Sequence, residues 1–240
     1  GMSSSRFGFS VENSVAMRAI FQLSQIKNVH LESLHLHLGT DIDSEAMYQF
    51  GARRLGMFTR EVESCIGYRL RYLDIGGGFP ASGLPPYGKK QWSPKSVSVY
   101  IDKISDELLR VLPDVDKRTL IVEPGRWLVD DAVCFVSQII HQENTPERQK
   151  IITNASITML PLLYYRPPIV QLFSASLGKK QGNLQNTTVF GASCREDDIL
   201  YRGLLLQSKV GDFLVYYCVG AYNQSMGSDF IFNKPLTEYI

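Results

Sequence analysis

The sequence has almost no excess of charge of either sign, because 25 lysines and arginines face 24 aspartates and glutamates in 240 residues. A formal net charge of +1 provides no basic field for a nucleic-acid backbone or an anionic membrane. Neither is therefore expected as a partner. A small molecule or another protein is the better expectation.

Cysteines and long apolar runs are also scarce. The four cysteines form neither a dense disulfide pattern nor a Cys-x-x-Cys metal pair, which indicates reduced thiols and a cytoplasmic location. No apolar stretch approaches the roughly 20 residues that span a bilayer. The first residues, Gly1 to Ser5, lack the charged and apolar regions of a signal peptide, so we expect a soluble protein.

The first half of the sequence alternates short apolar runs with segments of helical periodicity, which is typical of a parallel sheet whose strands are joined by helices. Strands are predicted at about 33–38, 72–75 and 119–122. Helices are predicted at about 11–25 behind a Ser10 cap, from a Ser44 cap to about 66, and at 96–112. The middle helix has five candidates for its inward face: Met47, Phe50, Leu55, Phe58 and Val62.

From about residue 132 the pattern changes to short runs of β-branched and aromatic residues, at 133–140, 187–190 and 213–218, separated by polar stretches rich in turn residues. Such a pattern predicts an all-β unit. The sequence therefore predicts two domains, an α/β domain at 1–131 and an all-β domain at 132–240.

Three polar or glycine-bearing segments follow the three predicted strands: HLHLGT at 35–40, DIGGGFP at 74–80 and EPGR at 123–126. In a (β/α) barrel, the carboxyl ends of the strands carry the chemistry. The glycines at 76–78 could let backbone N–H groups approach a phosphate, and Arg126 could bind the same group. Each segment taken alone fits an ordinary turn equally well.

Other candidate residues also have plain alternatives. Glu123 could hold a protonated ring nitrogen or pair with a lysine, and His37 could stack on a cofactor or sit hydrogen-bonded in a core. His35 and His37 could bind a metal, but no matching Cys/His cluster appears elsewhere, so no metal is expected. Cys194 in a polar loop could be a proton donor or an inert thiol, and Tyr222 could reach a phosphate or fill a core.

Taken in order, the blocks resemble the fold-type-III pyridoxal-phosphate-dependent decarboxylases of ornithine, diaminopimelate and arginine. The blocks are RFG at 6–8, HLHLGT, LDIGGGFP, VEPGRWLV, GASCREDD, and GDFL with GAYNQSM. The resemblance implies the carboxy-terminal part of an alanine-racemase-like (β/α)8 TIM barrel, followed by a β-sandwich or β-barrel domain. An unrelated α/β phosphate-binding module would require the whole series to be a coincidence.

The resemblance also implies roles for individual residues. His37 would stack on the pyridine ring, Glu123 would pair with its nitrogen, and Cys194 would return a proton to the substrate Cα across a dimer interface. These three are the predicted catalytic residues. The phosphate would be bound by Thr40, Gly76, Gly77, Gly78, Gly125, Arg126 and Tyr222.

The sequence departs from the family pattern after the cysteine, where an acidic residue is usual. Arg195 stands there and suits a distal carboxylate on the substrate, whereas Asp198 keeps acidic charge nearby for an amine. We therefore assign both residues to substrate binding and leave the preference open.

A second departure concerns the lysine that holds the cofactor's aldehyde in this family. It is expected on the first barrel strand, well upstream of Arg6, and no lysine in this sequence matches it. A barrel usually takes about 250 residues and eight strands, more than the α/β half offers. We therefore expect a homodimer or a complementing amino-terminal polypeptide as partner. The alternative is a catalytically inactive homologue that binds or regulates a complete decarboxylase.

Overall fold

The computed structural model describes residues 5–178 and 180–239, which divide into two compact units. The first unit comprises the residues up to 80 together with 93–125, and the second comprises 81–92 together with the residues from 126 onward. Residues 81–92 lie between the two parts of the first unit in the sequence but belong to the second unit. The sequence pattern does not indicate this.

The first unit contains a parallel sheet with the strand order β1-β2-β3. Its strands are β1 (Ser33–His35), β2 (Tyr72–Asp74) and β3 (Thr119–Ile121). All three begin at the predicted residues. They end earlier than predicted, because the residues that follow each strand leave the ladder and form the polar loops.

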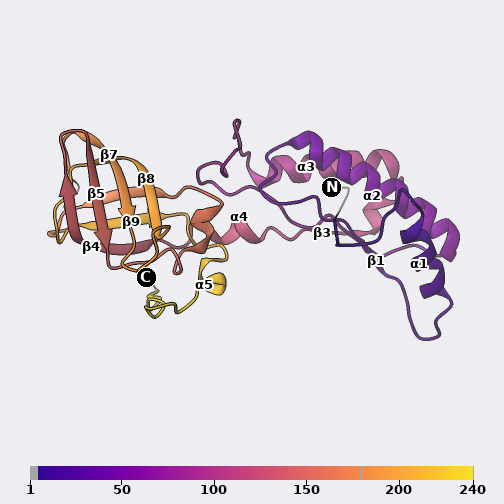
Figure 1. Ribbon diagram of the computed structural model, residues 1–240. Helices are drawn as coiled ribbons and strands as arrows, with labels where there is room; N and C mark the ends of the chain where they lie inside the picture. Colours follow the sequence, from indigo (N-terminus) through magenta and orange to yellow (C-terminus); the bar gives the residue numbers. More distant parts are fainter. Residues whose placement is uncertain (1–4, 179, 240) are drawn as a thin grey trace. The chain divides into compact units, whose positions relative to one another are not determined.

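Two helices cover one face of this sheet, α2 (Glu45–Ile66) and α3 (Val97–Val111) (Figure 1). The α2 helix begins where predicted, since the Ser44 hydroxyl accepts a hydrogen bond from the Met47 amide. It ends at Gly67, which adopts a left-handed φ of 79° that favours glycine. The shared core holds Tyr48, Ala52, Leu55, Leu73, Ile75, Tyr100, Ile104 and Leu108.

Two details of the predicted helices are wrong. Met47 and Phe50 are exposed, because the buried face of α2 instead carries Tyr48 and Ala52. The first helix, α1 (Val15–Ser24), begins later than predicted, since Ser14 at φ 61° lies in the left-handed region and cannot continue a right-handed helix. Residue 10 therefore does not cap it.

The second unit is a six-stranded mixed sheet with the order β6-β9-β4-β5-β7-β8. Only the pairing of β5 with β7 is parallel. The two strands at the ends of this order contact each other, so the sheet approaches a closed barrel around a core of aliphatic residues. The strands are β4 (Phe135–Asn144), β5 (Arg148–Thr153), β6 (Ile169–Phe173), β7 (Leu184–Phe190), β8 (Ile199–Leu206) and β9 (Phe213–Tyr217).

This arrangement confirms the predicted fold class, a partial parallel α/β unit and an all-β unit, although β5, β6 and β8 were not predicted individually. Short helical turns complete the described chain: η1 (Val115–Lys117), α4 (Gly125–Val129), η2 (Pro161–Tyr164) and α5 (Asn223–Met226). None of the helices in the described ranges is both long and apolar enough to cross a membrane. All four cysteines are free thiols.

Candidate active site

Parallel pairing of β1, β2 and β3 brings three distant parts of the sequence into cross-strand rows. In one row His35 lies beside Asp74, and its Nδ1 is 3.0 Å from the Asp74 carboxylate. Successive residues of a strand point to opposite faces of a sheet. The leucines next to His35 and His37 pack against the core under α2 and α3, whereas the two histidines are exposed on the other face.

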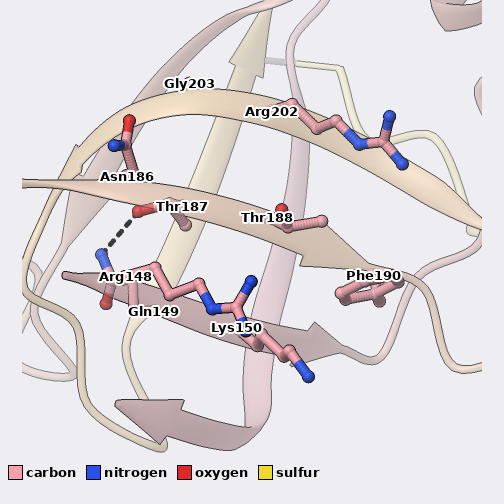
Figure 2. Close-up of a pocket in the computed structure, with 9 residues that line it drawn as sticks. All are labelled: Arg148, Gln149, Lys150, Asn186, Thr187, Thr188, Phe190, Arg202 and Gly203. Atoms are coloured by element: carbon pink, nitrogen blue, oxygen red, sulfur yellow. Dashed lines mark hydrogen bonds between the residues drawn. The ribbon is translucent and has the colours of Figure 1, made fainter. Parts of the chain in front are cut away.

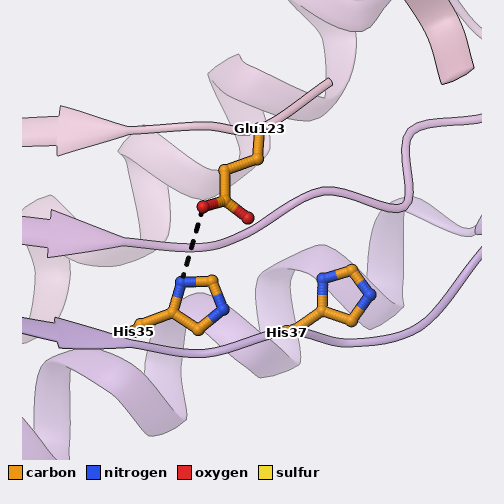
Figure 3. Close-up of side chains that lie close together, drawn as sticks. All are labelled: His35, His37 and Glu123. Atoms are coloured by element: carbon orange, nitrogen blue, oxygen red, sulfur yellow. Dashed lines mark ion pairs between the residues drawn. The ribbon is translucent and has the colours of Figure 1, made fainter. Parts of the chain in front are cut away.

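Glu123 follows β3 and adds a carboxylate to the face that carries the two histidines (Figure 3). One of its oxygens lies 4.0 Å from His35 Nδ1. The rings of His35 and His37 lie nearly parallel, with centroids 6.4 Å apart. Two imidazoles and a carboxylate thus gather at the carboxyl ends of the strands.

The same three side chains could hold a metal ion, because one ligand atom from each lies within 4.8 Å of the others. The sequence argument against a metal considered only cysteines and histidines. It missed Glu123, which lies about 85 residues further along the chain and joins the histidines only through the parallel pairing. Exposed groups of this kind are common without an ion.

The glycine triplet after β2 makes a turn so tight that side chains are excluded from it. Gly76 and Gly78 adopt φ values of 69° and 87°, which favour glycine. A Cβ on Gly77 would lie 2.4 Å from the Glu123 carbonyl oxygen, and one on Gly78 would lie 2.4 Å from the Gly39 carbonyl oxygen. The triplet therefore holds the ends of all three strands close together.

Two amides of this turn already have acceptors. Gly76 N–H donates to the Asp74 carboxylate at 2.8 Å, and Gly77 N–H donates to His37 Nδ1 at 3.3 Å. Because Nδ1 of His37 accepts, the neutral ring carries its proton on Nε2. A phosphate bound by these amides, as predicted, would have to share or replace both bonds.

Two further predicted phosphate ligands lie in the same unit. Thr40 is exposed in the loop after β1, and Gly125 opens α4, where its N–H donates to the Glu123 carbonyl oxygen at 2.8 Å. The amide of Gly125 is thus engaged in the turn that follows β3.

Arg126 belongs to the second unit and is fixed there by two neighbours. Its guanidinium lies 5.3 Å from the centroid of the Tyr222 ring and 3.7 Å from the Asp130 carboxylate. Asp130 also pairs with Arg166 at 3.2 Å and accepts the Ala221 amide at 3.3 Å. The two predicted phosphate ligands of this unit, Arg126 and Tyr222, therefore lie together.

Sequence reasoning missed the buried partners Asp130 and Arg166. Arg166 donates to the Leu84 carbonyl oxygen, and its guanidinium lies 5.2 Å from the Trp92 ring centroid, so it ties residues 81–92 to the β unit. No local pattern marks either residue. Only the tertiary structure brings them within reach of each other.

Cys194 is exposed in the loop between β7 and β8. Asp198, at the end of the same loop, is buried and accepts backbone hydrogen bonds. The Asp198 side chain is only 1% exposed; it accepts the Ile157 amide at 2.6 Å and the Ser193 amide at 3.1 Å. A Cβ on Gly191 would lie 2.3 Å from the same carboxylate. These contacts make Asp198 a residue that positions the Cys194 loop, and its predicted contact with substrate stays a prediction that they do not support.

Arg195 is exposed beside the cysteine and is held by a two-point pair with Asp197, at 2.9 and 2.7 Å. A third bond, at 3.3 Å, runs to the Tyr164 hydroxyl. The hydrogen bond from Arg195 holds the pKa of Asp197 below its usual range, and the same bond raises the pKa of Arg195. Asp197 and Tyr164 therefore both bind the guanidinium of the residue next to Cys194.

The predicted site residues thus form two groups, one in each unit. His37, Thr40, Gly76 to Gly78, Glu123 and Gly125 lie in the first unit, whereas Arg126, Cys194, Arg195, Asp198 and Tyr222 lie in the second. That both groups line one cleft stays a prediction.

Comparison with known proteins gives these groups a context. Residues 1–130 match the family model described as "Pyridoxal-dependent decarboxylase, pyridoxal binding domain". Diaminopimelate decarboxylase of Methanocaldococcus jannaschii is 26% identical over 232 residues, which cover 96% of this chain and 51% of that protein. The Bacillus subtilis diaminopimelate decarboxylase is 27% identical over 238 residues, which cover 96% of this chain and 52% of that protein.

Solved structures agree with this fold. A crystal structure of the Methanocaldococcus jannaschii diaminopimelate decarboxylase is similar with a TM-score of 0.80 and 25% identity, over 95% of this chain and 50% of that one. The arginine decarboxylase of Paramecium bursaria Chlorella virus has a TM-score of 0.79 at 19% identity, over 96% of this chain and 58% of that one, which is a likeness of fold. The chain spans about half the length of the curated relatives it matches.

Proposed function

Since the chain belongs to the family of pyridoxal-dependent decarboxylases, we propose that it forms the carboxy-terminal part of an enzyme that removes carbon dioxide from an amino acid. The substrate is a basic or diamino acid, or a carboxylated derivative of one. One observation carries this proposal: an imidazole, a carboxylate and a glycine turn meet at the carboxyl ends of three parallel strands, where a (β/α) barrel places its chemistry.

The residues present fit pyridoxal phosphate. His37 offers an exposed flat ring, and Glu123 offers a carboxylate that is 53% exposed on the same face, a suitable partner for a pyridine nitrogen. The three residues of the glycine turn carry no side chains of their own. In the second unit, the guanidinium of Arg126 stands over the Tyr222 ring, and both groups can donate to phosphate oxygens.

When bound, the cofactor supplies an electron sink for the pair left on Cα after carbon dioxide departs. In the proposed site Glu123 would hold a proton on the pyridine nitrogen and His37 would stack on the ring. Arg126 and Tyr222 would bind the phosphate and so orient the group. The exposed Cys194 would donate the proton that returns to Cα.

The lysine that binds the cofactor's aldehyde must come from elsewhere in this proposal. Strands β1, β2 and β3 carry no lysine. We therefore propose that a lysine-bearing amino-terminal part completes the barrel, and that a homodimer brings the Cys194 loop of one copy to the site of the other. The chain by itself then binds the cofactor weakly and without a covalent link.

Arg195 bears on the choice of substrate. Its guanidinium is presented beside Cys194 in a fixed orientation by Asp197 and Tyr164. A group that is positively charged and already oriented favours a substrate with a distal carboxylate over one with a distal amine. Diaminopimelate, which has such a carboxylate, fits this preference better than ornithine or arginine.

A second candidate function rests on the same absence of a strand lysine. An inactive homologue would keep the fold and bind a complete decarboxylase as a regulatory partner. The test below separates the two proposals, because only the first predicts turnover once a lysine-bearing part is supplied.

The test compares the chain alone with the chain joined to a polypeptide that carries the lysine-bearing strands. We expect a borohydride-reducible link to pyridoxal phosphate, located by mass spectrometry on the added lysine, and release of carbon dioxide from the joined protein only. Cys194→Ala should impair proton return to Cα more than cofactor binding, with Cys65→Ala as the matched control. A reducible link and turnover in the chain alone would show that one of its own lysines performs the chemistry.

A further inference from the structure

A cavity of about 400 Å³ lies on the outer face of the β unit, over strands β5, β7 and β8 (Figure 2). The strand register sets its geometry. Lys150 pairs with Thr188, and Thr188 pairs with Arg202, so the two cations flank the threonine in one cross-strand row. Strands in a sheet are about 4.8 Å apart, so the two cationic residues start roughly 10 Å apart. Their long side chains can therefore reach one ligand above Thr188.

The cavity is lined by cations without acids. Arg148, in the neighbouring row, is the third cation, and no aspartate or glutamate is among the lining residues. Lys150 has a distant pair at 3.8 Å with Glu143, both side chains being at least half exposed. Within the described ranges no carboxylate lies within 4 Å of the guanidinium groups of Arg148 and Arg202.

Between the outward-facing residues, Gln149 and Thr187 point to the inner face of the sheet and are buried. There the Gln149 amide donates to the Thr187 hydroxyl at 2.8 Å and to the Leu206 carbonyl oxygen at 2.9 Å. Asn186 and Thr188 stand on the outer face between the cations and offer neutral hydrogen-bond donors. Phe190 supplies one apolar wall.

From this arrangement we infer that the cavity is a binding site for a small phosphate-bearing anion, of the phosphomonoester class. Arg148 and Lys150 on β5 and Arg202 on β8 place three like charges on one face of the sheet, and a bound dianion offsets their mutual repulsion. A tetrahedral phosphate can accept from two guanidinium groups, an ammonium and a hydroxyl at once. The net charge of +1 argues against a long polyanion, which would need a broad basic surface. The site is separate from the residues assigned to decarboxylation and does not depend on that assignment.

Isothermal titration of the chain with inorganic phosphate at low ionic strength tests the inference. We expect a dissociation constant of about 1 mM or below, and acetate at the same concentration should bind far more weakly. Arg202→Gln and Arg148→Gln should each weaken phosphate binding about tenfold, the loss of one charge-assisted contact. Lys209→Gln, which removes the same charge from an exposed residue outside the cavity, should leave binding unchanged.

Two further arms make the outcome unambiguous. Arg126→Gln should not alter this binding, whereas it should abolish binding if phosphate instead occupies the proposed cofactor site. Amide NMR of the unsubstituted chain should show phosphate-dependent shifts at Thr188 and Gly203, a readout that needs no variant to fold. Equal weakening by Lys209→Gln and Arg202→Gln, or shifts confined to other residues, would overturn the inference.

Discussion

Replacing Asp198 by alanine should unfold the second unit at much lower denaturant concentration. The buried carboxylate accepts two backbone amides, from Ile157 at 2.6 Å and from Ser193 at 3.1 Å. A hydrogen bond to a charged group contributes about 1.5–3 kcal/mol, and its loss leaves a buried donor without a partner. Two such losses predict a destabilisation of about 3–6 kcal/mol. Asp198→Asn should cost about half as much, because its amide oxygen can still accept one of the two bonds.

Tryptophan fluorescence during urea unfolding measures this effect selectively. The sequence contains two tryptophans, and both Trp92 and Trp127 belong to the second unit. The matched control is Asp197→Asn, one residue away, whose exposed carboxylate pairs only with exposed or partly exposed groups and should leave the midpoint close to that of the unsubstituted chain. A midpoint for Asp198→Ala no lower than that of Asp197→Asn would refute the reasoning. The Cys194 loop would then be held by other contacts.

Three further predictions concern the first unit, whose unfolding is followed by circular dichroism of its helices. Gly77→Ala should destabilise it by about 1–3 kcal/mol, because the new Cβ would meet the Glu123 carbonyl oxygen at 2.4 Å, and an unchanged midpoint would contradict this. Arg118→Met should cost about 3 kcal/mol, since it removes the cation that pairs with the partly buried Glu63, whereas Asp114 keeps its pair with Arg69. Arg71→Met, at an exposed pair, should change little. The hydrogen bond from Arg53 lowers the pKa of Glu107 in the folded chain. The stabilisation from this bond is therefore present above the unfolded pKa of about 4.3 and is lost as the pH falls through the lower folded pKa. Glu107→Gln should reduce this acid sensitivity of unfolding, and an unchanged pH profile would contradict the assignment.

Local sequence determined the helices and strands of the first unit well. The α2 helix follows from a serine cap, an apolar periodicity and a glycine stop, all of which act within one or two turns. Its inward face was harder to predict, because Met47 and Phe50 are as apolar as the residues that are buried. Only packing against α3 and the sheet decides which stripe faces the core.

Some requirements of the candidate site can be predicted from the sequence, because they depend on residue types within a short segment. Glycines at 76–78 are needed by a turn with positive φ and close backbone contacts, and those needs are visible in the residue types themselves. By contrast, the cluster of His35 with Glu123 depends on the pairing of β1, β2 and β3.

Tertiary structure alone decided the roles of the buried charges and the placement of the basic cavity. Asp198 reads as one of three acidic residues in a polar loop, yet it is buried and bound by amides from distant segments, whereas Asp197 is exposed. Arg148 and Arg202 are separated by more than 50 residues and meet because β7 pairs with β5 on one side and with β8 on the other. Burial and electrostatics depend on neighbours in space, and no local sequence pattern predicts the strand order that creates those neighbours.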